Sequence, residues 1–269
     1  MRHIKKLLLS LFLFLLSSNL CFGEDLLVHF IDVGYGDSIL IEFADKRNIL
    51  IDGGDQENGG KVCQYLKKRN IEKIDLLIAT HPHPDHIGGL SSVIENFSID
   101  KILTNIDISE SKEYALLFKA VEASGIEFSR IGRGDLIDWV KETEVEVFHP
   151  SNLSGDSNND SLVIKLTYGQ VSFLFTADIG RKVIDNLIDN YGLRLKSNVL
   201  KVPHHGESGD STLIEAVAPQ IAVISTGPSK WPEPSEELIS KYKSSKIAVL
   251  RTDHKGDIVI RTDGREVLF

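Results

Sequence analysis

The stretch IATHPHPDHIGGL, Ile78–Leu90, gathers three histidines and one aspartate within six positions. The four side chains are His81, His83, Asp85 and His86. An apolar run typical of a buried strand precedes them, and a segment with helical periodicity follows. Pro82 and Pro84 restrict the backbone, which lowers the entropy lost when the loop is held in one conformation. The stretch therefore predicts a stiff loop between a strand and a helix.

Imidazole and carboxylate groups at this density indicate a metal site. His81 and His83 alternate along an extended loop and so face one side, whereas Asp85 and His86 can serve a neighbouring position. This donor set suits zinc, and manganese or iron fit it as well. Scattered surface or helix-capping histidines are the simpler alternative. Four ligand-type residues in one spaced group disfavour it.

Strand and helix patterns alternate along the chain on both sides of this loop. Residues 26–43 and 161–178 each predict a hairpin, with turns at 34–37 and 168–170. Two mixed sheets packed face to face, with helices outside both, satisfy this order of elements, so we expect a four-layer αβ/βα sandwich of the α/β class. No linker rich in Gly, Pro or Ser interrupts residues 24–269, which favours one domain.

The first 23 residues, MRHIKKLLLSLFLFLLSSNLCFG, differ from the rest of the chain. A positively charged start precedes a nearly unbroken apolar run at 7–16, and small residues, Cys21 and Gly23, occupy the −3 and −1 positions of a cleavage site. This pattern predicts a secretory signal peptide over 1–23, a secreted or periplasmic destination, and no stable membrane insertion after cleavage. The apolar run is shorter than the ~20 residues of a spanning helix, which disfavours an uncleaved anchor. A poor lipobox disfavours a lipid on Cys21.

Net charge and cysteine content restrict the possible functions of the protein and the ways in which its fold can be stabilised. Removal of 1–23 takes away three positive charges and no acid, so the formal net charge falls from −9 to −12. That balance argues against broad electrostatic adhesion to nucleic acid, but not against a nucleic-acid substrate held at a metal centre. Cys63 is then the one remaining cysteine, and a single thiol cannot form an internal disulfide. The fold must be held by its core or by metal.

The histidine loop matches in full the HxHxDH signature of the metallo-β-lactamase superfamily, which this chain resembles. The resemblance implies an αβ/βα hydrolase fold with one or two metals at the edge of the sheets. It also implies a bridging aspartate after a later strand, where Asp178 stands in FLFTAD, and a last histidine in LKVPHHG. His204 and His205 both fit that last place. We favour His204 as the ligand and His205 as a residue that contacts substrate or the transition state.

With two metals, the resemblance places His81 and His83 on one, three further ligands on the other, and Asp178 between them. Those three are Asp85, His86 and His204. A water shared by the metals would lose a proton near neutral pH and attack a phosphorus or carbonyl carbon. Asp85 would orient this hydroxide and His205 would stabilise developing charge, so these two residues are the catalytic candidates.

A narrower resemblance covers essentially all of residues 24–269. The segments FIDVGYGDSILIEF, THPHPDHIGGL, NNDSLVIKLTYGQVSFLFTADI and LKVPHHGESGDST look like the C-terminal metallo-β-lactamase domain of ComEC-type DNA-uptake proteins. That likeness implies a phosphodiesterase or nuclease, with DNA or another phosphodiester as its partner. Hydrolysis of another ester, such as a phosphocholine ester, a lactone or a β-lactam, is the alternative enzymatic reading. A non-catalytic metal-binding scaffold is the alternative from another class.

The chain departs from the superfamily pattern in its ligands to the first metal. A third histidine is usual between the first motif and the bridging aspartate, and His149 is the one histidine available there, in a setting that looks structural. Asn158 or Asp160, in the polar loop PSNLSGDSNNDS, could replace it, so these three candidates stay open. Asp52, at the end of NILID, is expected to hydrogen-bond a ligand histidine and fix its tautomer.

Overall fold

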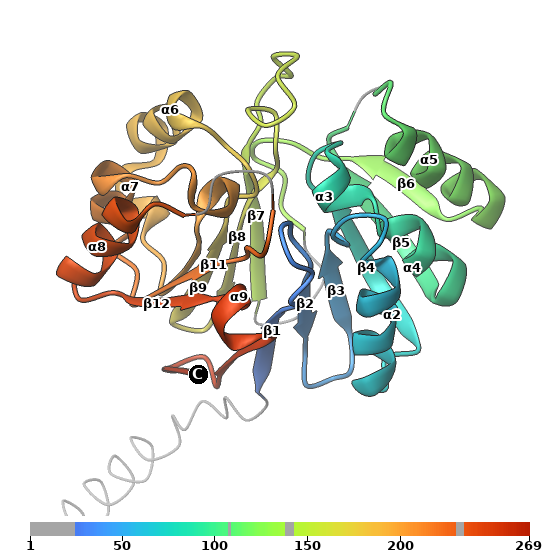
Figure 1. The fold of residues 1–269 in the computed structure, drawn as a ribbon, viewed down its shortest axis with the longest axis horizontal. Helices are drawn as coiled ribbons and strands as arrows, with labels where there is room; N and C mark the ends of the chain where they lie inside the picture. Colours follow the sequence, from blue (N-terminus) through green and yellow to red (C-terminus); the bar gives the residue numbers. More distant parts are fainter. Residues whose placement is uncertain (1–24, 107–108, 138–142, 230–233) are drawn as a thin grey trace, which may run out of the picture.

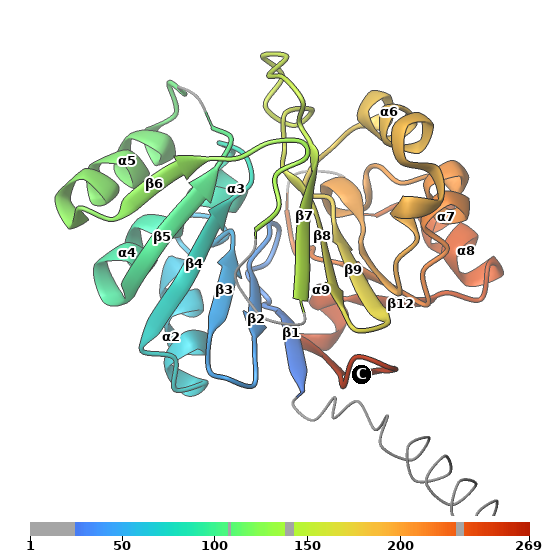
Figure 2. The ribbon, with the colours of Figure 1, turned by 180° about the vertical axis from the view of Figure 1, so that it is seen from behind.

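Two mixed β-sheets lie face to face with helices on both outer sides (Figures 1 and 2). The computed structural model describes residues 25–106, 109–137, 143–229 and 234–269. Within them the layers follow the order helix, sheet, sheet, helix, which confirms the predicted αβ/βα sandwich. The predicted signal peptide, 1–23, lies outside the described residues, so the division at residue 24 stays a prediction.

The first sheet has eight strands within the described residues, in the order β14-β13-β1-β2-β3-β4-β5-β6. They are β1 (Leu26–Phe30), β2 (Ile39–Glu42), β3 (Asn48–Ile51), β4 (Lys73–Ala79), β5 (Ser98–Thr104), β6 (Glu127–Arg130), β13 (Ile258–Thr262) and β14 (Val267–Leu268). Strands β1 to β3 pair antiparallel, which confirms the first hairpin, and β3 to β6 run parallel.

The second sheet has six strands within the described residues, in the order β12-β11-β10-β9-β8-β7. They are β7 (Thr143–His149), β8 (Val163–Tyr168), β9 (Val171–Phe175), β10 (Val199–Lys201), β11 (Ile221–Ile224) and β12 (Ala248–Arg251). Strands β8 and β9 form the second predicted hairpin, and β9 to β12 run parallel.

Three apolar cores hold the four layers together. The inner core joins the facing sides of the sheets through residues such as Phe30 and Phe173. One outer core packs α2 (Gly59–Lys68), α4 (Leu90–Asn96) and α5 (Lys112–Ser124) on the first sheet. The other packs α6 (Arg181–Tyr191), α7 (Ser211–Val217) and α8 (Glu236–Ser244) on the second sheet. Each strand that separates two cores is therefore apolar on both faces, as its sequence indicates.

The parallel strands bring their carboxyl ends to one edge of the sandwich, where ligands of open α/β sheets usually bind. Asp52 follows β3, the histidine loop follows β4, Asp178 follows β9 and the His204–His205 pair follows β10. The polar loop 150–161 rises beside this edge (Figure 1). The topology therefore brings the site residues that were predicted from the sequence to one edge of the sandwich.

Two features of the sheets were not predicted. Strand β6 adds an edge to the first sheet, although its four residues lack an apolar pattern. The C-terminal hairpin β13–β14 also joins the first sheet, through β1, rather than extending the second. Among the described helices, none is both long and apolar enough to cross a bilayer.

Candidate metal centre

The histidine loop is held by tight packing against the loop that follows β3. Helix α3 (Pro84–Ile87) begins directly after His83, with Pro84 at its first position. The Gly53 N–H donates to the His86 carbonyl, 2.7 Å away. A Cβ on Gly89 would collide with the Gly53 carbonyl, which explains why glycine is required there. These contacts fix the direction in which the ligand-type side chains point.

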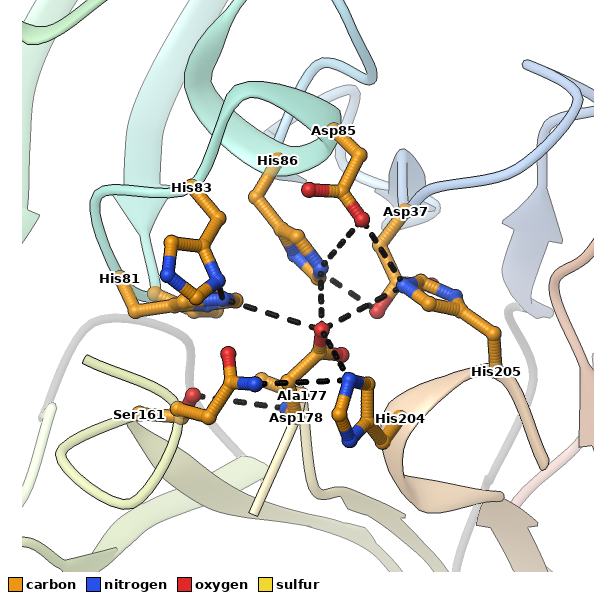
Figure 3. A network of polar contacts seen from close by, with 12 residues as sticks. Asp37, His81, His83, Asp85, His86, Ser161, Ala177, Asp178, His204 and His205 are labelled. Carbon is orange, nitrogen blue, oxygen red and sulfur yellow. Dashed lines mark hydrogen bonds and ion pairs between the residues drawn. The ribbon is translucent and has the colours of Figure 1, made fainter. Parts of the chain in front are cut away.

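Four side chains converge on one point and form what we call the inner ligand group. They are Asp85, His86, Asp178 and His205, whose ligand atoms all lie within 4.8 Å of one another. Asp178 Oδ2 lies 3.2 Å from His86 Nε2 and 3.4 Å from His205 Nε2. His205 Nε2 also lies 3.2 Å from Asp85 Oδ2. Figure 3 shows the Asp178 carboxylate at the centre of this ring.

A second set shares Asp178 and forms the outer ligand group. It consists of His81, His83 and Asp178, again within 4.8 Å. His81 Nε2 lies 3.8 Å from Asp178 Oδ2 and 3.2 Å from His83 Nδ1 (Figure 3). The alternation expected for His81 and His83 therefore places both imidazoles on one side of Asp178. Asp85 and His86 lie in the inner ligand group.

The donor chemistry of both groups fits divalent cations. Imidazole nitrogens and carboxylate oxygens face one another across 3.2–4.8 Å. This is the spacing of donor atoms around a cation rather than that of a packed core. His86 Nε2 and Asp178 Oδ1 are buried and make no hydrogen bond with any described residue. Buried polar atoms normally have a partner. A cation between the groups would provide it.

Hydrogen bonds behind the imidazoles fix which nitrogen faces the centre. His86 Nδ1 lies 2.8 Å from Asp52 Oδ2, and His205 Nδ1 lies 2.9 Å from the Ser225 carbonyl. Both acceptors can only accept, so Nδ1 carries a proton and Nε2 faces the ligand groups. Thr80 Oγ1 donates to Asp52 Oδ2 at 2.7 Å and lies 3.1 Å from His81 Nδ1. Asp52 therefore orients His86 directly and His81 through Thr80, as expected of it.

A buried ion pair behind the inner group was missed by the sequence analysis. Lys201 Nζ lies 2.5 Å from Asp37 Oδ2, 3.3 Å from the Ala177 carbonyl and 3.9 Å from Asp178 Oδ1. Asp37 and Lys201 are 2% and 1% exposed, so water does not screen the pair. Asp37 in turn lies 3.9 Å from His86 Nδ1 and 3.8 Å from His205 Nδ1. One signal was available: a lysine inside the otherwise apolar strand VLKV.

Mutual charge keeps the carboxylates of the inner group ionised. Burial opposes ionisation of Asp178, but the adjacent His86 and His205 imidazoles hold its pKa well below its usual value. Burial likewise opposes the charge on His205, but the Asp178 carboxylate outweighs it and raises the pKa of His205 to about 9. Burial would raise the pKa of Asp85, but the His205 hydrogen bond and the nearby His86 and His205 imidazoles together hold that pKa below its usual value. In the outer group, burial and the nearby His86 lower the pKa of His81.

The two adjacent histidines after β10 take different places. Both have left-handed backbone conformations, with φ of 51° and 52°, so the chain turns sharply between them. His205 is buried and belongs to the inner group, whereas His204 is 25% exposed and its Nε2 lies 4.0 Å from Asp178 Oδ2. His204 also lies 3.7 Å from Glu207 Oε2. His205, rather than the His204 favoured as a ligand from the sequence, therefore lies within the inner ligand group, while His204 lies at its edge; which of the two binds metal stays a prediction.

The three candidates for a further ligand of the first metal, His149, Asn158 and Asp160, make different contacts. His149 Nε2 hydrogen-bonds to the Asn159 carbonyl at 2.7 Å, and the Asp160 carboxylate accepts from the Ser154 and Gly155 backbone N–H groups. Both side chains hold the polar loop in shape. Asn158 differs, because its Nδ2 lies 3.4 Å from His204 Nε2 and so reaches the centre.

Two cavities are lined by residues next in sequence to members of the ligand groups. One, of about 290 Å³, is lined by Gly206 and Glu207, and in part by Arg181 and Lys241. The other, of about 230 Å³, is lined by Pro82 and by residues of the polar loop. Tyr35 packs on His205, with ring centroids 4.3 Å apart, and its hydroxyl lies 3.5 Å from Glu207 Oε1.

Sandwiches of this layering that carry an HxHxDH loop at the strand ends form one class of metal-dependent hydrolases. Residues 31–227 match the family described as the Metallo-beta-lactamase superfamily. The chain belongs to that superfamily, which confirms the first resemblance seen in its motifs.

The relatives confirm the narrower resemblance as well. The chain is 29% identical over 282 residues to "ComE operon protein 3" of Bacillus subtilis (strain 168), covering 96% of this chain and 36% of that protein. It is 28% identical over 234 residues to "Competence protein ComA" of Neisseria gonorrhoeae, covering 84% of this chain and 30% of that protein. The chain thus spans about a third of the length of these curated relatives.

A solved structure supports the architecture alone. CmlA, a diiron beta-hydroxylase from Streptomyces venezuelae, superposes with a TM-score of 0.56 at 13% identity, covering 89% of this chain and 55% of that one. That protein is a diiron hydroxylase by name, and neither zinc nor hydrolysis is part of its description. Fold therefore fixes neither the metal nor the reaction, which have to be argued from the residues.

Proposed function

We propose that this protein is an exported, metal-dependent phosphodiesterase that acts on nucleic acid, with zinc or manganese as its cofactor. The observation that carries the proposal is the single carboxylate oxygen, Asp178 Oδ2, that both ligand groups share. Paired metal sites of that kind stabilise the attacking and leaving oxygens of an in-line displacement at phosphorus. The names of the two relatives point to competence, and hence to DNA as the class of substrate.

In such an enzyme the residues of the two ligand groups have distinct roles. Divalent cations held by the inner and outer ligand groups would supply a Lewis acid and activate water near neutral pH. His205 and His86 hold the inner group, with their Nε2 atoms directed by Ser225 and Asp52. Asp85, the most exposed member of that group at 24%, is placed to orient the attacking water. His204, at the edge of that group, is placed to contact the substrate.

The cavity beside Glu207 offers cationic side chains near the ligand groups. Arg181 and Lys241 line it together with Glu207, Asp210 and Glu237, and both cations are paired with acids there. Arg and Lys are the usual contacts of phosphate oxygens, so a neighbouring phosphate of a longer substrate would compete with these acids for them.

The test is a substrate panel with the purified protein loaded with zinc or with manganese. We expect hydrolysis of bis-p-nitrophenyl phosphate and of single-stranded DNA, and none of nitrocefin. His83→Ala should abolish it, while His254→Ala, on an exposed histidine of α9 (Thr252–Lys255), should not. Hydrolysis of nitrocefin or of a phosphocholine ester without any cleavage of DNA would contradict the proposal, and metal binding without hydrolysis would favour a scaffold.

Export is tested separately on the full chain. The pattern at 1–23 predicts cleavage after Gly23. We expect the protein that leaves the cytoplasm of a bacterial host to begin at Glu24. A cytoplasmic product that retains residues 1–23 would contradict export without touching the catalytic proposal.

A further inference from the structure

Asn158 offers an oxygen that no described residue satisfies. Its Oδ1 is buried and has no hydrogen-bond partner within the described ranges, although its Nδ2 faces His204 Nε2 at 3.4 Å. A buried amide oxygen left unpaired costs about 1–3 kcal/mol. Folded proteins therefore usually provide such an atom with a partner.

Several contacts tie the turn that carries Asn158 to the ligand groups. The Leu162 N–H donates to the carbonyl of Thr80, the residue before His81, at 3.1 Å. The Ser161 hydroxyl accepts from the Asp178 N–H at 3.4 Å, and the Ser161 N–H donates to the Asn158 carbonyl at 3.1 Å. The turn is thus anchored on one side to the strand end that supplies His81 and on the other to Asp178.

The turn also holds the Asn158 amide beside His204. The Asp160 N–H donates to the Asp156 carbonyl at 2.8 Å and closes the turn around Asn158. Asn158 Nδ2 then lies 3.4 Å from His204 Nε2, whose own distance to Asp178 Oδ2 is 4.0 Å. The amide therefore lies next to a residue that borders the carboxylate shared by both ligand groups.

We propose that Asn158 Oδ1 is an oxygen ligand of the cation held by His81, His83 and Asp178. The assignment rests on the proposed metal-dependent function and deepens it. An imidazole nitrogen that accepts a hydrogen bond from Nδ2 cannot bind metal with the same lone pair, so the amide also keeps His204 out of the coordination sphere. A neutral oxygen in place of a third imidazole makes this site more favourable to harder cations such as manganese than a three-histidine site would be.

The experiment compares cation binding by variants of the metal-free protein, with no substrate present. Manganese and zinc are titrated separately against a chromogenic chelator, and spin coupling between two bound manganese ions is followed by electron paramagnetic resonance. His83→Ala identifies the outer binding phase. Asn158→Leu should weaken that phase by about tenfold or more, the lower end of what even indirect partners of a metal contribute. It should also remove the spin coupling and leave the inner phase unchanged.

Matched variants separate a ligand from a structural residue. Asn158→Asp keeps an oxygen and should bind as tightly as the unaltered chain or tighter, and Asn152→Ala, on the exposed part of the same loop, should change nothing. His204→Ala should leave the outer phase intact. Unchanged binding by Asn158→Leu, or an equal loss in His204→Ala, would overturn the assignment alone. Absence of any cation binding by the unaltered chain would overturn the proposed function with it.

Discussion

The inner and outer ligand groups share the Asp178 carboxylate but differ in how firmly hydrogen bonds hold their imidazoles. Both imidazoles of the inner group have a full hydrogen-bond partner behind Nδ1, Asp52 for His86 and Ser225 for His205, and a buried ion pair lies behind them. In the outer group His81 is held by the Thr80 hydroxyl, while His83 stands on a loop stiffened by prolines and is partly exposed.

Because of this difference, the two groups should bind cations with unequal affinity. Residues behind a ligand raise metal affinity because they fix its tautomer and its direction before the metal arrives. The inner group is preorganised in this sense, so we expect it to bind the first cation tightly. The outer group orders its donors when the second cation binds, so we expect a weaker and more exchangeable phase.

The largest effect is expected from the atom that the groups share. Asp178→Asn keeps the size of the side chain but removes the charge from both groups. Because even an indirect partner is worth about 10–100-fold in affinity at one metal, loss at both should lower affinity and phosphodiester hydrolysis by about a thousandfold or more. Metal content after gel filtration and the rate with bis-p-nitrophenyl phosphate measure this. Retention of one tightly bound metal would show that Asp178 serves only one group.

The next effect concerns the ion pair behind the inner group. Lys201→Met leaves Asp37 buried and unpaired, and breaking one partner of a buried pair typically costs about 3–5 kcal/mol of unfolding free energy. The double variant Asp37→Asn with Lys201→Met should regain most of that loss, because no uncompensated charge remains. Urea denaturation of the metal-free proteins measures both. A double variant no more stable than the single one would show that the pair contributes packing rather than charge balance.

The same comparison of regions shows what the sequence could predict. Most of the outer group is local: His81 and His83 lie on one loop, and their spacing alone predicted that their side chains face one side, near Asp85 and His86. The order of strands and helices also followed from periodicity and turn residues, as with the glycine that ends α5 in a left-handed conformation. Local patterns carry these features because the interactions that set them span only a few residues.

The inner group depends on contacts between distant segments, and there the sequence reasoning failed in part. Asp37 lies in the loop between β1 and β2 and Lys201 at the end of β10, and no local pattern around either residue indicates that they pair. The choice between His204 and His205 depended on two successive left-handed residues, which no periodicity reports. Strand β6 has too few apolar residues to be recognised and exists because it pairs with β5. Tertiary context decided each of these cases.

A third test compares the residues that hold the two groups. Asp52→Asn weakens the acceptor behind His86 Nδ1, so the inner phase should lose about 10–100-fold in affinity. Thr80→Val removes the hydroxyl behind His81 and should weaken the outer phase by less, because a hydroxyl at 3.1 Å orients an imidazole less firmly than a carboxylate at 2.8 Å. Chelator competition resolves the two phases. An equal loss of both phases in Thr80→Val would show that the hydroxyl acts mainly through Asp52, to which it donates.

The smallest effect is a difference in pH dependence between the two phases. The pKa of His205 is raised to about 9 from the ~6.5 of an unfolded chain, so its charge stabilises the metal-free fold fully below about 6.5 and this contribution is lost as the pH rises through about 9. A metal takes only the neutral imidazole, so His205 should release a proton on binding and add up to about tenfold in affinity per pH unit across that window. Burial lowers the pKa of His86, but the Asp178 and Asp52 carboxylates outweigh burial and raise it, so His86 should release a proton as well. His81, whose pKa is lowered, is already neutral there, so the outer phase should change less. Calorimetry in buffers of different ionisation enthalpy counts the protons, with His205→Gln as the control that removes one of them. An inner phase that binds without releasing protons would mean that Asp178 does not hold His205 in its charged form.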